Sequence, residues 1–195
     1  MDRYTQFAIV AATEALADSK LNLDNINKQR VGVLVGSGIG GLSTIEAQIR
    51  SLVNKGPNRV APLTIPMSIS NIASGAIAIK FGLLGSSFSI TSACASSTHC
   101  IGEAYRNIKD GYSDIIFAGG SEASICEFGI SSFQSLTALS KSEDRNRASI
   151  PFDLNRNGFV MGEGAGVLIL EDLESALKRG AKIYCEIVGY GTTSD

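Results

Sequence analysis

Residues 87 to 97 constrain the fold more than any other stretch, because an alternation of apolar and polar residues runs directly into a cysteine and then into small residues. Phe88 and Ile90 share one face of an extended chain by its two-residue repeat. Beyond Cys94, the segment 101–108 carries apolar residues at helical spacing, and an Asp-Gly pair marks its end. The pattern predicts a strand that delivers Cys94 to the N-terminus of a helix.

A cysteine in that position has two interpretations. The free amides and the macrodipole of a helix N-terminus favour the thiolate, which is the reactive form of the side chain. The same amides can bind the oxyanion of a thioester adduct. Most cysteines are instead buried structural residues. Position alone leaves Cys94 open between a nucleophile and a core residue.

Several runs around and beyond this cysteine are distinctive, and they are Thr91–Ser97 (TSACASS), Ile101–Ala104 (IGEA), Ala118–Ala123 (AGGSEA), Pro151–Asp153 (PFD) and Gly158–Gly166 (GFVMGEGAG). Together they resemble the beta-ketoacyl-acyl-carrier-protein synthases of the elongating type II branch, which are condensing enzymes of the thiolase-like superfamily. The resemblance extends over essentially the whole chain. It implies that Cys94 is the catalytic nucleophile.

The order of the expected elements predicts an α/β fold. The run Val31–Val35 is typical of a strand buried on both faces. Further strands are expected at 114–118, 167–170 and 183–188, helices at 5–19, 68–81 and 172–179, and irregular chain at 57–66. The buried strand predicts parallel pairing, and the order of elements predicts a layered α/β fold with helices on both faces of the sheet. The resemblance implies that the sheet is mixed. It also identifies the fold as thiolase-like and incomplete at both ends, with residues 1–195 forming one domain, most of the N-terminal ketoacyl synthase domain.

Composition narrows the class of function. With 17 basic and 19 acidic residues the chain has a net charge of −2, which offers no bulk basic field for nucleic acid or for anionic lipid. A mean hydropathy of +0.15 without a long apolar run argues against a membrane span. Four cysteines are too few for a dense disulfide framework and lack metal-site spacing, which indicates the cytoplasm.

The glycine-rich segment Gly36–Gly41 follows a buried strand and satisfies the G-x-G-x-x-G pattern of dinucleotide sites. The acidic residue that such sites carry about twenty positions later is missing, because that region is Lys55–Arg59. The pattern therefore disfavours a nucleotide. The resemblance instead places this loop beside an acyl tunnel, with Ile39 as the residue that gates it.

The resemblance also implies a wider acyl pocket. Thr64 matches a stretch that contributes to the partner subunit's pocket, and Gly129 and Phe133 match positions near the bound chain. Simple packing is an equal alternative for the apolar residues of 128–139. Glu163 lies in a region that supports the site without transferring protons.

His99 is the only histidine, five residues after the cysteine. On one helix, five steps of about 100° place the two side chains well apart around the axis, so a direct Cys-His pair is not expected. The synthases of this branch use two further histidines and a lysine from their second half. We therefore expect this chain to be a fragment that is acylated but does not condense by itself.

The mechanism that the resemblance implies has two steps. Cys94 takes an acyl group from the phosphopantetheine of acyl carrier protein, and the carbanion from decarboxylating malonyl-carrier protein then attacks the acyl-cysteine to give a beta-ketoacyl product in fatty acid biosynthesis. No metal or other cofactor is expected, and the protein is expected to be a homodimer. A polyketide ketosynthase, a thiolase-type acyltransferase and a non-catalytic acyl-binding module remain as alternatives.

Overall fold

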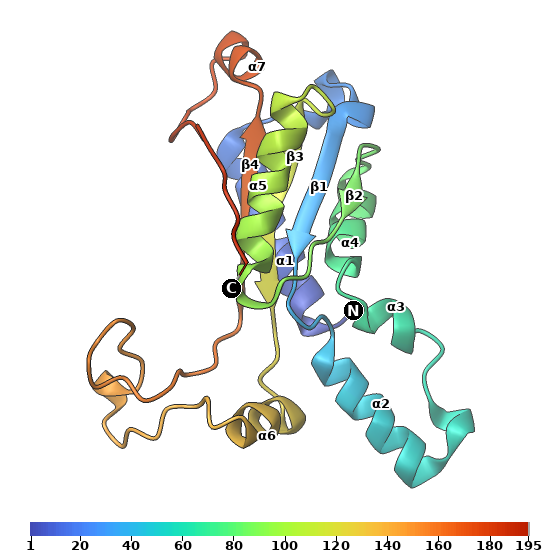
Figure 1. Cartoon of the computed structure of the whole chain (residues 1–195). Coiled ribbons are helices and arrows are strands. Elements are labelled where there is room, and N and C mark those ends of the chain that lie inside the picture. The colour runs from blue at the N-terminus through green and yellow to red at the C-terminus, as the bar shows by residue number, and fades with distance from the viewer. Residues whose placement is uncertain (195) are drawn as a thin grey trace.

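A computed structural model of the chain describes residues 1–194, and Figure 1 shows a twisted sheet enclosed by helices, with a further group of helices beyond one end of it. The strands are β1 (Val31–Gly36), β2 (Ser87–Phe88), β3 (Ile115–Glu122) and β4 (Gly164–Glu171). The α-helices are α1 (Arg3–Ser19), α2 (Leu42–Lys55), α3 (Thr64–Ser68), α4 (Ile72–Phe81), α5 (Ser96–Lys109), α6 (Glu127–Ser135) and α7 (Leu173–Lys178).

The sheet has the strand order β2-β1-β3-β4. Strand β1 runs parallel to both β2 and β3, with Val33 opposite Phe117, whereas β4 is antiparallel to β3, with Ile169 opposite Phe117. The expected mixed sheet is therefore confirmed. Strands β1 and β3 are buried almost throughout, as their continuous apolar sequences predict.

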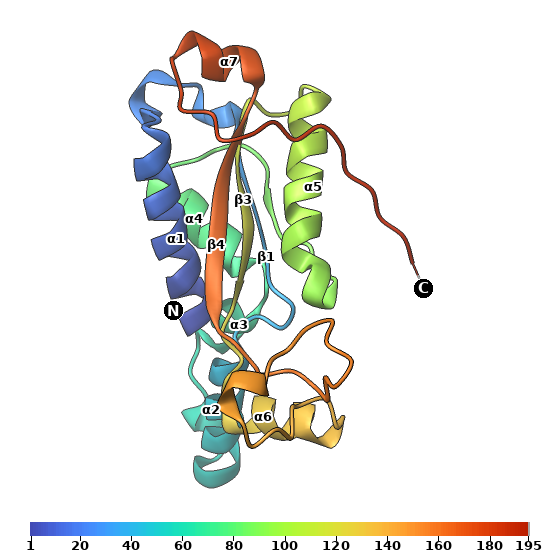
Figure 2. The ribbon, with the colours of Figure 1, turned by 90° about the vertical axis from the view of Figure 1, so that its left-hand side faces the viewer.

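Helices cover both faces of the sheet, and Figure 2 shows α1 and α4 on one side and α5 on the other. Val33 and Phe117 pack with the fully buried Ala8 and Ala12 of α1 in one core cluster. Leu34, the neighbour of Val33 in β1, belongs instead to the cluster under α5. Because successive side chains of a strand point to opposite faces, β1 contributes residues to the core on each side of the sheet.

Two of the expected elements between β1 and β2 are wrong in their bounds. The expected helix over 68–81 begins only at Ile72, as α4, because Ser68 ends α3 and the backbone of Ile69 is extended. The Tyr4 hydroxyl donates a 2.5 Å hydrogen bond to the carbonyl of Ile69 at this break. The segment 57–66 is also less irregular than expected, since it includes a 3₁₀ turn at Pro57–Arg59 and the start of α3. Helix α2 lies where no element was expected.

The expected strand over 183–188 is also wrong, because the structure has no strand there. The segment pairs with no backbone of the sheet and is held instead by side chains. The Tyr184 hydroxyl donates to Asp18 of α1, and the Tyr105 hydroxyl of α5 donates to the carbonyl of Val188. Among residues 1–194, no helix has the length and apolar character needed to cross a lipid bilayer.

Candidate active site

Cys94 lies in the 3₁₀ turn Ala93–Ala95, which leads directly into α5. The predicted placement at a helix N-terminus is therefore confirmed, and the side chain is exposed. Ala93 has a φ of 51°, a left-handed conformation that is unfavourable for a residue with a side chain. We call residues 92–96 the cysteine elbow, because the chain turns there from the β2 side of the sheet into α5.

Short hydrogen bonds hold the cysteine elbow closed. The Ser96 hydroxyl donates to the carbonyl of Ala93 at 2.7 Å and accepts from the amide of Ser92 at 2.9 Å. The Ser92 hydroxyl in turn shares a 2.6 Å hydrogen bond with Nδ1 of His99. These bonds offset the strain at Ala93 and leave the thiol between them on the surface.

Two glycines at the carboxyl ends of β1 and β3 make room for this turn. A Cβ atom on Gly36 would lie 2.8 Å from the carbonyl oxygen of Ser96, and one on Gly120 would lie 2.7 Å from Cβ of Ser97. Both distances are shorter than ordinary contacts. The first turn of α5 can therefore sit directly against the sheet only because these positions lack side chains.

No side chain caps the start of α5, although the Ser96 amide donates to the carbonyl of Ala93 within the 3₁₀ turn. The other amides of the first helical turn have no side-chain partner. Such amides attract negative charge, both on a thiolate and on the oxygen of a tetrahedral adduct. Within residues 1–194, no group of three or more His, Cys, Asp and Glu side chains lies close enough together to hold a metal ion. The arrangement is suited to nucleophilic attack by Cys94 on an acyl carbonyl.

Ile39 lies in the turn after β1, which is in direct contact with the cysteine elbow. A Cβ on the neighbouring Gly38 would be 3.5 Å from the carbonyl oxygen of Ala93. The Gly38 amide donates a 2.6 Å hydrogen bond to Glu122. A phosphate would need that amide, so the carboxylate is a second argument against a dinucleotide here.

The other residues expected to line the acyl pocket lie on α3 and α6. Thr64 begins α3 and borders a cavity of about 330 Å³ shared with α2. Gly129 is buried in α6, where an added side chain would collide with the carbonyl of Ser124. Phe133 packs edge-on against Phe159, with ring centroids 5.4 Å apart. No bound acyl chain tests these roles, and they remain predictions.

Glu163 holds the chain in place, as its expected supporting role requires. Its Oε1 accepts from the amide of Ile125 at 2.8 Å, and its Oε2 pairs with Arg3. Glu46 likewise links α2 to α6. The Cys126 thiol, the amide of Phe128 and the Arg50 guanidinium together lower the pKa of Glu46 to about 2.

The sequence did not predict the Ser92–His99 bond of the elbow or the hydrogen bonds of Glu122 to the turn after β1. For Glu122 the available signal was its position at the end of a buried strand, one residue beyond Ser121 and the glycine pair Gly119–Gly120. For the Ser92–His99 bond there was no signal, because it depends on the irregular path of the elbow.

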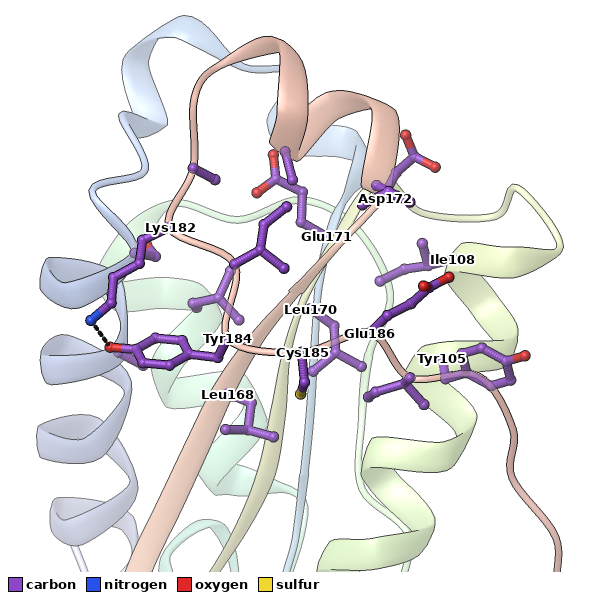
Figure 3. Close-up of a pocket in the computed structure, with 18 of the residues that line it drawn as sticks. Tyr105, Ile108, Leu168, Leu170, Glu171, Asp172, Lys182, Tyr184, Cys185 and Glu186 are labelled. Atoms are coloured by element: carbon purple, nitrogen blue, oxygen red, sulfur yellow. Dashed lines mark hydrogen bonds between the residues drawn. The ribbon is translucent and has the colours of Figure 1, made fainter.

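A second cavity, of about 400 Å³, lies at the opposite end of the sheet from the elbow, beside α7 (Figure 3). Its walls come from β4, α1, α5 and residues 181–187. Lys182 donates to the Tyr184 hydroxyl at 2.7 Å, and Cys185 and Glu186 lie along the same segment. The irregular segment 181–187 forms one wall of the cavity, which is separate from Cys94.

A mixed sheet between helices, with an exposed cysteine at a strained turn into a helix, defines a chain of the thiolase-like class. The comparison with protein families assigns it further: residues 1–176 match the family described as beta-ketoacyl synthase, N-terminal domain. The chain belongs to the beta-ketoacyl synthase family.

Curated relatives agree with this assignment. Over 195 residues the chain is 48% identical to a 3-oxoacyl-[acyl-carrier-protein] synthase 2 of Staphylococcus aureus strain N315, covering all of this chain and 47% of the relative. It is also 48% identical to the synthase of the same name from Synechocystis, again covering 47% of that protein. The chain therefore spans about half the length of these relatives.

Solved structures share the fold. A beta-ketoacyl synthase from Burkholderia phymatum is 33% identical with a TM-score of 0.88, covering 100% of this chain and 48% of that one. A type II polyketide acyl-carrier protein in complex with its ketosynthase contains a chain that is 34% identical, with a TM-score of 0.85, covering 93% of this chain and 46% of the other.

Proposed function

We propose that the protein containing this chain is a 3-oxoacyl-acyl-carrier-protein synthase of fatty acid chain elongation, and that Cys94 accepts the acyl group. The observation that carries the proposal is the exposed Cys94 thiol in the strained turn at the uncapped N-terminus of α5. The 48% identity to synthases that bear this name supports the choice of reaction.

In the first step the Cys94 thiolate attacks the carbonyl carbon of an acyl thioester on a carrier protein. The carbonyl oxygen takes up negative charge, which the free amides at the start of α5 can stabilise. The new carbon–sulfur bond forms at Cys94, the bond to the phosphopantetheine sulfur breaks, and the departing thiolate takes a proton from solvent. One thioester replaces another, so the free-energy change is small.

In the second step malonyl-carrier protein loses carbon dioxide, and its carbanion attacks the acyl-Cys94 carbonyl. The product is a beta-ketoacyl thioester two carbons longer, and the Cys94 thiolate is regenerated. We assign to this chain the nucleophile and part of the acyl pocket. Its one histidine, His99, bonds to Ser92, so the groups that promote decarboxylation are expected outside this sequence.

The partner that this chemistry requires is an acyl carrier protein, and the acyl groups arrive on its phosphopantetheine. A ketosynthase among the related structures is in complex with such a carrier. The proposal includes a homodimer, with Thr64 reaching toward the partner's pocket, and no metal or further cofactor. It also includes a cytoplasmic location, where four free cysteines stay reduced.

The test is acyl transfer from a long-chain acyl-carrier protein to the whole protein, followed by mass spectrometry of its peptides. The acyl group should appear on the peptide that contains Cys94, and Cys94→Ala should abolish it. Cys185→Ala is the matched control, because Cys185 is also exposed but lies on the irregular segment after α7. Acylation of both cysteines to the same extent would contradict the proposal.

A polyketide ketosynthase is the second possibility, favoured by the similarity to a type II polyketide ketosynthase. The two differ in the extended chain. A fatty acid enzyme should accept fully reduced acyl groups and discriminate against poly-beta-keto chains, and the reverse preference would favour the polyketide function. Preference for coenzyme A thioesters would indicate a thiolase-type enzyme, and absence of any transfer a non-catalytic acyl-binding module.

A further inference from the structure

Glu122 is a half-buried carboxylate at the end of β3 that forms no ion pair within residues 1–194. Its charge is balanced by neutral donors. One oxygen accepts from the Gly38 amide at 2.6 Å, and the other accepts from the hydroxyls of Ser37 and Ser124, each at 3.1 Å. A carboxylate without these donors would be costly in such a place.

Ser37 transmits this contact to the turn that carries Ile39. While its hydroxyl donates to Glu122, the same oxygen accepts from the Gly40 amide at 2.9 Å. Gly38 and Gly40 stand on either side of Ile39, so both flanking amides depend on the Glu122–Ser37 pair. Glycines leave the backbone freer than other residues do, and these hydrogen bonds therefore determine how the turn is held.

The same turn is bonded to Thr91, the residue directly before the cysteine elbow. The Thr91 hydroxyl donates to the carbonyl of Ser37 at 3.0 Å. A Cβ on Gly38 would lie 3.0 Å from Oε2 of Glu122 and 3.5 Å from the carbonyl oxygen of Ala93. The Glu122 carboxylate therefore packs against the turn, and the turn packs against the cysteine elbow. Ile39 remains 39% exposed at its edge, free to move if the turn is released.

We propose that Glu122 is a positioning residue that holds Ile39 in place beside Cys94, and that it thereby sets which acyl chain lengths reach the thiol. It acts through Ser37 and Gly38 and not on the reacting atoms. The acyl substrate and the gating by Ile39 rest on the proposed function, whereas the hold of Glu122 on the turn rests on its own contacts.

Glutamine at this position would keep the size of the side chain but not its bonding. It offers one acceptor oxygen and an amide donor in place of the second oxygen, so it cannot serve the Gly38 amide and both serines as the carboxylate does. We therefore expect Glu122→Gln to release the turn. Ser37→Ala is a smaller change in the same direction, because it removes the bond to Glu122 and the bond from the Gly40 amide but keeps the bond from the Gly38 amide to Glu122.

The experiment compares two alkylating probes on the whole protein, iodoacetamide and an iodoacetamide with a long N-alkyl chain. The rate at Cys94 is read by mass spectrometry of its peptide. In Glu122→Gln the ratio of the long-probe rate to the short-probe rate should rise about tenfold, as expected for the loss of one charge-assisted hydrogen bond. Ser37→Ala should raise the ratio by a smaller factor.

Glu103→Gln is the matched control, because Glu103 forms a surface pair with Arg106 on α5. It should leave the ratio unchanged. The decisive comparison uses Ile39→Ala, which should raise the ratio by itself. If Glu122 acts through Ile39, adding Glu122→Gln to Ile39→Ala has no further effect.

A purely structural role for Glu122 would slow or speed both probes equally. An unchanged ratio in both Glu122→Gln and Ser37→Ala would overturn the inference, and so would an effect of Glu122→Gln that persists without the Ile39 side chain. Acyl transfer to the wild-type protein is measured separately. If transfer fails while the ratio changes, the proposed function is wrong and the positioning role stands; if transfer succeeds with an unchanged ratio, only the positioning role is wrong.

Discussion

The hydroxyl of Ser92 and Nδ1 of His99 lie 2.6 Å apart, so a bond between the start of the cysteine elbow and the second turn of α5 spans the position of Cys94. The histidine ring also packs edge-on against Tyr190, with centroids 6.3 Å apart. His99 is therefore fixed from both sides. Because Nδ1 of His99 bonds to Ser92, the histidine stabilises the cysteine elbow.

Replacement of His99 should weaken the elbow. His99→Ala removes the partner of Ser92, and we expect the free energy of unfolding to fall by about 1–2 kcal/mol, measured by urea denaturation. His99→Asn should recover a large part of the loss, because its amide can reach a position near that of Nδ1. Equal stability of the alanine variant and the wild type would show that the bond contributes nothing.

Crowding at the end of β3 should destabilise the protein. Gly120→Ala places a Cβ 2.7 Å from that of Ser97 and should cost about 1–3 kcal/mol of stability, with a loss of Cys94 reactivity as α5 is displaced. Gly162→Ala is the control, since a Cβ there meets no atom within 4 Å. Similar melting temperatures for the two variants would contradict the packing argument.

The four cysteines should differ in their reaction with iodoacetamide at neutral pH. Cys94 and Cys185 are exposed and should be alkylated first. Cys100 should resist because burial raises the pKa of its thiol, and Cys126 because burial and then Glu46 raise its pKa. Peptide mapping over time measures the order. Early labelling of Cys100 in the folded protein would be inconsistent with its place on the buried face of α5.

Tyr4 should make the fold sensitive to alkaline pH. Desolvation by burial raises the pKa of its hydroxyl from 10.0 to about 12. The folded protein therefore favours the neutral phenol, and this stabilisation is complete below pH 10 and is lost as the pH rises toward 12. Two pKa units correspond to about 2.7 kcal/mol.

The difference in unfolding free energy between the wild type and Tyr4→Phe, followed from pH 9 to pH 12, isolates this effect from other titrations. The advantage of the wild type should shrink over that range. A constant difference would mean that the Tyr4 hydroxyl ionises as it does in water.

Local patterns were enough to predict several parts of this protein. Continuous apolar runs identified β1 and β3, and the helical spacing after Cys94 identified α5. The strand predicted before Cys94 is limited to Ser87–Phe88, and the chain from 89 to 92 is irregular. The predictions of β1, β3 and α5 succeeded because each depends on residues near one another in the chain. The spacing of Leu42, Ile45 and Ile49 carried a similar signal for α2, which the analysis of the sequence overlooked.

Contacts between distant residues decided the rest. At the break before α4, the Tyr4 hydroxyl binds the carbonyl of Ile69, which is 65 positions away. The segment 183–188 has strand-forming residues, but a strand exists only where another backbone pairs with it. Glu122 lies next to Ser37 and Gly38 only because β1 and β3 are neighbours in the sheet. The sequence by itself determined most of the elements and the place of Cys94 before a helix, whereas the folded sheet decided which side chains surround Cys94, because those hydrogen bonds join segments that only folding brings together.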